Sequence, residues 1–251
     1  MRKILAKTAW QTLAAIGFLI VVWACLYLAA GNELLVPSLF ACFAEMGALL
    51  GSGAFWIALL ASFLRALEAF AISFVFALIF AIIAYLVPSF EKLFAPLASA
   101  LRSLPVLAVL LILLSVLSAG QAPVAVAFLS LFPMLYTGIL AALSGVDKQV
   151  IAISRVHGTP LWRKVTRIYL PLSAPYILRE SGGALAFSLK LVVSAEVLAN
   201  TAKSLGGMMQ EAKIYAEIPE LFALVFATFF VGLLLELAAT ALASYVQKRM
   251  Q

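Results

Sequence analysis

Residues 103–146 read SLPVLAVLLILLSVLSAGQAPVAVAFLSLFPMLYTGILAALSGV and contain no Asp, Glu, Lys or Arg. A membrane-spanning helix needs about 20 apolar residues, so this stretch is long enough for two such helices. Gly120 and Pro123, near the middle of the stretch, indicate a short turn between them. The apolar residues run on without alternating with polar ones, which favours helices over the strands of a membrane barrel.

The composition of the whole chain supports the same interpretation. Of its 251 residues, 65% are hydrophobic and 11% are charged, whereas soluble domains have about 45–50% and about 25%. A soluble globular protein with this composition would expose large apolar patches, and disordered chains are poor in apolar residues. Both classes are therefore excluded.

Further apolar runs predict the remaining membrane-spanning helices, over residues 9–30, 56–90, 181–199 and 221–246. Together with the two helices of the central stretch they predict an all-α polytopic membrane protein with about six transmembrane helices. We expect one domain over residues 1–251, with its core at about 55–247.

The distribution of basic residues predicts the orientation in the membrane. In a six-span arrangement, thirteen Lys and Arg residues fall on one side and two on the other. Because cytoplasmic loops carry the excess of Lys and Arg, both termini are expected in the cytoplasm. The net charge of +6 is too small and too dispersed to indicate binding to nucleic acid. Residues 37–50, on the outer side, resemble a short interfacial helix, with Ser38 as its N-cap.

Chemistry-bearing motifs are absent from the sequence. It has two cysteines, Cys25 and Cys42, one histidine, and no HExxH, GxSxG or GxxxxGK[ST] motif. We therefore expect no catalytic residue, no metal site and no cofactor on this chain. Without the phosphate-binding loop, the chain cannot hydrolyse ATP by that device.

The long basic loop at residues 147–179 is expected to be folded. Thr159 is a good N-cap and Pro160 suits the first helical position. The residues after them show one apolar and one basic face, as in an amphipathic helix. The loop is therefore predicted to consist of two short helices joined by a glycine corner at Gly158. The second helix ends at Leu170-Pro171, where the chain is expected to turn back toward the membrane. An amphipathic hairpin resting on anionic lipid headgroups is the alternative interpretation.

The spacing within this loop supports a more specific interpretation. Gly158, nine residues, Ile168, one residue and Leu170-Pro171 match G-x9-I-x-L-P. This pattern resembles the cytoplasmic signature loop of bacterial ABC importer permeases, which holds a coupling helix that docks on a separate ATPase. The Glu-Ala-Ala that usually precedes the glycine is replaced here by residues 152–154. The resemblance implies ATPase contacts at Ala152, Ile153, Ser154, His157, Gly158, Thr159, Trp162, Ile168, Leu170 and Pro171.

Shorter motifs extend the resemblance to about residues 35–250. SFLR at 62–65, LRSLP at 101–105, VVSAE at 192–196 and the Leu-Gly pair at 205–206 resemble family motifs in the expected order. The most similar subgroup transports taurine, alkanesulfonates and nitrate, and it includes permeases for pyrimidine precursors of thiamine.

The resemblance also implies a setting for the chain. It implies a location in the bacterial inner membrane and contact with lipid, and a second permease copy in a homodimer. Two ATPase subunits would carry ATP and Mg²⁺, and an extracytoplasmic binding protein would deliver the substrate.

Ionisable residues inside predicted spans are costly, so they are candidates for the substrate path. They are Arg65, Glu68, Lys190, Glu196 and Glu236. Lys190, in the middle of its span, could attract an anion such as a sulfonate, act as a gate, or form an ion pair with Glu236 or Glu196. Arg65 and Glu68 lie three residues apart on one helix face and are expected to pair with each other.

Three other functions remain open from the residues. A stand-alone secondary carrier would usually have an internal repeat, and none is visible. An intramembrane enzyme would need a convergent cluster of His, Asp, Glu or Cys, and none is visible. An adaptor subunit of a vitamin importer would also have coupling helices, but it would lack the G-x9-I-x-L-P spacing.

Overall fold

The computed structural model describes residues 2–146 and 160–250, which form helices and no strand. The all-α prediction is therefore confirmed for this part of the chain. The elements are, in order, α1 (Arg2–Ala30), α2 (Leu39–Gly51), α3 (Gly53–Leu86), α4 (Pro88–Ser103), α5 (Val106–Leu114), α6 (Ala122–Ser144), α8 (Leu161–Lys164), the π-helical turn η1 (Val165–Tyr169), α9 (Leu170–Ala199), α10 (Leu205–Ile214) and α11 (Ile218–Met250).

Four helical segments of the described chain are long and apolar enough to cross a membrane: α3, α6, the continuous segment Leu161–Ala199 and α11. The pair α4 and α5, bent by 85°, adds a fifth crossing if it counts as one span. Helix α1 has 29 residues, but the apolar helix found within it, Gly17–Ala30, is shorter than the roughly 20 residues that a crossing needs. The described residues therefore contain four or five candidate spans, and a sixth span at α1 stays a prediction.

The third expected span differs from a straight helix. Helix α4 ends at Ser103, Leu104 is extended at φ −66° and ψ 130°, and α5 begins only after Pro105. Proline disfavours helical geometry in the residue before it, so the chain breaks here. The apolar residues after Pro105 then form a helix of only nine residues.

The chain does not turn back at Leu170-Pro171, which corrects the expected end of the loop and the expected start of the fifth span at residue 181. Helix runs without interruption over Leu161–Ala199. In the π-helical turn before Pro171, the Leu170 amide donates to the Val165 carbonyl oxygen, five residues back. A widened turn gives the proline ring room that a regular α-helix would deny it.

The core lies between α3, α6 and α9. Helix α3 buries a stripe of small residues along one face, and their size lets neighbouring helices approach closely. These are Ser62, Ala66, Ala69, Ser73, Ala77, Ala81 and Ala84. Tyr136 and Leu131 of α6 and Leu189 of α9 are among the largest fully buried side chains.

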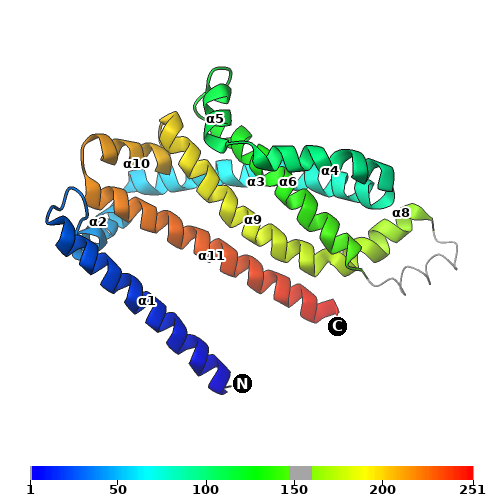
Figure 1. Cartoon of the computed structure of the whole chain (residues 1–251), viewed down its shortest axis with the longest axis horizontal. Coiled ribbons are helices and arrows are strands. Elements are labelled where there is room, and N and C mark those ends of the chain that lie inside the picture. Colours follow the sequence, from blue (N-terminus) through cyan, green and yellow to red (C-terminus); the bar gives the residue numbers. More distant parts are fainter. Residues whose placement is uncertain (1, 147–159, 251) are drawn as a thin grey trace.

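The elements define two poles (Figure 1). Helices α2 and α10 and the α1–α2 connection lie at the left of the view. Helix α8 lies at the right, and the two ends of the chain lie lower, the N-terminus near the centre and the C-terminus to its right. We call these the α10 pole and the α8 pole. Helix α2 corresponds to the short helix expected at 37–50, and Ser38 Oγ accepts a hydrogen bond from the Ala41 amide at 3.2 Å, which confirms Ser38 as the N-cap.

Candidate functional site

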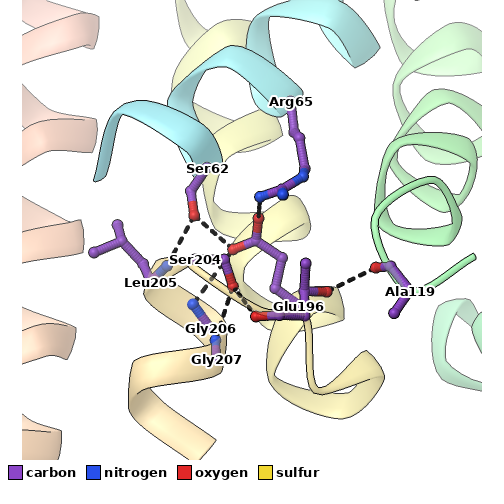
Figure 2. A network of polar contacts seen from close by, with 9 residues as sticks. Ser62, Arg65, Ala119, Glu196, Ser204, Leu205, Gly206 and Gly207 are labelled. Atoms are coloured by element: carbon purple, nitrogen blue, oxygen red, sulfur yellow. Dashed lines mark hydrogen bonds and ion pairs between the residues drawn. The ribbon is translucent and has the colours of Figure 1, made fainter. Parts of the chain in front are cut away.

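A buried carboxylate near the α10 pole organises the polar groups of the core. The Glu196 side chain is 0% exposed, and its Oε1 lies 2.8 Å from Nη1 of Arg65 on α3. Ser62 donates its hydroxyl hydrogen to Glu196 Oε2 at 2.6 Å, and the Gly206 amide donates to the same oxygen at 3.3 Å. Figure 2 shows these groups converging from three helices. Each carboxylate oxygen therefore has a partner, as burial of a charge requires.

Local sequence explains why α10 begins beside this carboxylate. Asn200 adopts the left-handed conformation, with φ 50° and ψ 50°, and so ends α9 shortly after Glu196. Ser204 caps α10, its Oγ accepting from the Gly207 amide at 2.9 Å. In the first turn of α10 the Gly206 amide donates to Glu196, where a helix N-terminus favours negative charge. A Cβ at Gly206 would overlap Glu196 Cβ, so this approach needs glycine.

The network extends to neighbouring segments (Figure 2). The Leu205 amide donates to Ser62 Oγ at 2.9 Å, which ties α10 to α3. Thr201 donates its hydroxyl hydrogen to the Ala119 carbonyl oxygen, in the α5–α6 connection, at 2.7 Å. The arrangement joins α3, α9, α10 and this connection. Glu196 and Arg65 form an ion pair, so within this chain the network holds these segments together. Their predicted place on the substrate path stays a prediction.

The expected pairing of Arg65 with Glu68 is wrong, because Arg65 pairs with Glu196 instead. Glu68 is exposed, whereas the Arg65 side chain is 22% exposed and reaches a carboxylate that water cannot. An ion pair is stronger in such a low-dielectric environment. Sequence reasoning also left Ser62 and Gly206 without a role, although the S-x-x-R spacing places Ser62 and Arg65 on one face of a helix.

Lys190 does not form either of the ion pairs considered for it. Neither Glu196 nor Glu236 lies within 4 Å of its ammonium group, and Glu236 is exposed. The side chain of Lys190 lines a pocket of about 250 Å³ between α9, α10 and α11. The structure therefore separates Lys190 from the polar network around Glu196.

The residues expected to contact an ATPase fall into two groups. Ala152, Ile153, Ser154, His157, Gly158 and Thr159 lie outside the described residues. The others lie on the continuous helix at the α8 pole: Trp162 is 75% exposed, Pro171 is exposed, and Ile168 and Leu170 are half-buried. Buried Tyr169, between them, packs its ring 5.1 Å from that of Tyr85 on α3.

Solved structures share this fold. The chain matches a bacterial alginate ABC transporter, solved in complex with an alginate pentasaccharide-bound periplasmic protein, with a TM-score of 0.66 and 14% identity over 97% of this chain and 96% of that one. It matches an amino acid ABC transporter, solved with histidines, with a TM-score of 0.62 and 16% identity over 78% and 94% of the two chains. At such low identity these matches show the fold alone.

Curated relatives and a family model give the closer relationship. Probable ABC transporter permease proteins of Brucella melitensis biotype 1 and Brucella abortus strain 2308 are each 28% identical to this chain over 147 residues. These matches cover 58% of this chain, and 59% and 58% of the two relatives. The model of the binding-protein-dependent transport system inner membrane component matches residues 73–251. With most of its length matched by that model, the chain belongs to the family of binding-protein-dependent transport system inner membrane components.

Proposed function

We propose that this chain is the membrane-spanning subunit of an ATP-driven ABC importer, with both termini in the cytoplasm. The observation that carries the proposal is the family match over residues 73–251, because it includes the G-x9-I-x-L-P segment. The α8 pole is the cytoplasmic side. Arg163 and Arg167, exposed at this pole, support that orientation because cytoplasmic segments are rich in basic residues.

The coupling step is mechanical. Separate ATPase subunits bind ATP and Mg²⁺, and they also bind the segment around Gly158 and Trp162. The helix Leu161–Ala199 has 39 residues and is therefore roughly 58 Å long. It connects exposed Trp162 with Lys190 and Glu196, so a displacement at one end moves the other. ATP can drive the change only if it binds one state of the bundle better than the other. No bond of the transported solute is broken.

Substrate and partners follow from the resemblance and from the α10 pole. An extracytoplasmic binding protein docks on the segments 31–54 and 200–220 and delivers a small solute. A groove of about 580 Å³ between α3 and α10 opens in this region. The solute is a small anion, either an organic one such as a sulfonate or a nitrate-like ion, or it is a pyrimidine precursor. Two copies of the chain form a homodimer around the path in the bacterial inner membrane.

The test is loss of ATPase docking in Gly158→Trp, co-expressed with an ABC ATPase of the same organism that co-purifies with the wild type, and purified in detergent. We expect the bulky side chain at the corner to abolish co-purification of the ATPase and leave the yield of the permease unchanged. Gly17→Trp is the matched control, because a Cβ at Gly17 has no neighbour within 4 Å.

Two outcomes would contradict the proposal. One is normal recovery of the ATPase with the Gly158→Trp variant. The other is solute uptake by vesicles that contain the purified chain without ATPase, which would indicate a stand-alone carrier.

A further inference from the structure

Lys190 carries a charge at a depth where charges are expensive. It lies about 14 Å along the axis from Ala199, the last residue of α9, which is close to half the thickness of the roughly 30 Å hydrocarbon core. Among the described residues no carboxylate lies within 4 Å of its ammonium group. Charged residues at such depth generally face a partner or a water-filled path. Within the described part of the chain Lys190 has no ion-pair partner, and its side chain is exposed. A position facing a water-filled path for a charged solute explains both observations.

The surroundings of Lys190 suit a small solute. The pocket of about 250 Å³ is lined by five apolar side chains besides Lys190 and the hydroxyls of Ser194 and Thr228. The lysine stem lies along α11 at Gly232, where a Cβ would meet Lys190 Cε at an ordinary van der Waals distance of 3.6 Å. The ammonium group is therefore held beside a small, mostly apolar space.

The hydroxyl groups of the pocket are committed as donors. Ser194 donates to the Lys190 carbonyl oxygen at 2.8 Å, and Thr228 donates to the Leu224 carbonyl oxygen at 2.9 Å. Their oxygens retain only acceptor capacity. Of the side chains that line the pocket, Lys190 is thus the one with hydrogens to offer an anion.

We propose that this pocket binds a small organic monoanion, with the acid group on the Lys190 ammonium and the apolar part of the molecule against side chains such as Met209 and Phe229. One ammonium group balances one negative charge. The apolar walls disfavour an inorganic anion, whose remaining oxygens would be buried without partners. The role of this binding in transport rests on the proposed function. The binding of the anion to the pocket does not depend on it.

The test measures binding of radiolabelled ethanesulfonate to the full-length chain in lipid nanodiscs by equilibrium dialysis. We expect saturable binding to the wild type and at least about tenfold weaker binding to Lys190→Gln, which loses a charge-assisted hydrogen bond. Lys190→Arg keeps the charge and is expected to bind within about threefold of wild type. Lys92→Gln, which removes an exposed lysine of α4, is the matched control and should bind as the wild type does.

Three results would overturn the proposal: no saturable binding to the wild type, equal binding to Lys190→Gln, or equal competition by inorganic sulfate and by neutral ethyl methyl sulfone. A second measurement needs no variant. Ethanesulfonate should protect Lys190 of the wild type from an amine-reactive reagent, as read by mass spectrometry, and absence of protection would count against the site.

Failure of the site and failure of the proposed function are distinguishable. Co-purification of the ATPase with Lys190→Gln would show that ATPase docking is intact, whether or not the variant binds the anion. If the chain binds the anion but recruits no ATPase, the anion-binding site is supported and the importer assignment is refuted.

Discussion

Glu196 shows how one residue can organise the packing of several helices. A buried carboxylate is tolerated only with partners for its charge and for its lone pairs. Arg65 supplies the charge, while Ser62 and the Gly206 amide supply hydrogen bonds. These partners come from α3 and α10, so the carboxylate holds both helices against α9. Its replacement should therefore loosen the α10 pole.

Glu196→Gln is expected to lower the free energy of unfolding by about 2–3 kcal/mol, because it leaves a mostly buried guanidinium unpaired. Equilibrium unfolding of the purified protein in mixed micelles measures the change. The control Glu68→Gln alters an exposed carboxylate of α3 and should shift stability by no more than about 0.5 kcal/mol. In the double variant Arg65→Met/Glu196→Gln, at least about half of the loss should be recovered. Additive losses would mean that the pair is not coupled.

The sequence identified Arg65 and Glu196 individually but not as partners. Ionisable residues in apolar runs stand out because each is costly in a membrane. Their pairing depends on how α3 packs on α9, and the two residues are 131 positions apart in the chain. Local spacing favoured Glu68, three residues from Arg65. Arg65 pairs with the buried carboxylate of Glu196 instead of the nearby, exposed carboxylate of Glu68.

The helices themselves were predictable from charge-free runs, whereas two of their ends were not. The effect of a proline depends on whether the helix before it can open. At Pro105 the chain breaks and the direction changes. At Pro171 the π-helical turn leaves room for the proline ring, so the helix continues to Ala199. No residue pattern before Pro171 signals that turn, so the continuous helix from the α8 pole became visible only in the structure.

Adjacent glycines on α9 give a matched test of helix packing. A Cβ at Gly182 would overlap Ala239 Cβ on α11, whereas a Cβ at Gly183 has no neighbour within 4 Å. Gly182→Ala should therefore push α9 and α11 apart and cost about 1–3 kcal/mol of unfolding free energy. Gly183→Ala should be neutral or stabilise by up to about 1 kcal/mol, because alanine favours helix. The same unfolding assay measures both, and equal effects would contradict this packing.

At the scale of the whole molecule, two contacts support six crossings. Helix α4 begins directly after the end of α3, and α5 leads to Ala119, whose carbonyl oxygen is bound by Thr201 at the α10 pole. The bent pair therefore returns the chain from one pole to the other. Near the end of α1, the Trp23 ring lies 5.0 Å from Phe222 at the start of α11. Helix α1 thus reaches the same pole as α10.

An even number of crossings places both tails on one side, and this arrangement can be tested by cysteine labelling. In a background of Cys25→Ala and Cys42→Ala, a membrane-impermeant maleimide should label Glu217→Cys in intact cells, because Glu217 is exposed in the connection between α10 and α11. Lys92→Cys and Lys248→Cys should react only after the cells are permeabilised, since basic segments stay in the cytoplasm. Labelling of Lys248→Cys but not Lys92→Cys in intact cells would indicate an odd number of crossings. The bent pair would then be a re-entrant loop, the two tails would lie on opposite sides of the membrane, and the basic α8 pole could not face a cytoplasmic ATPase.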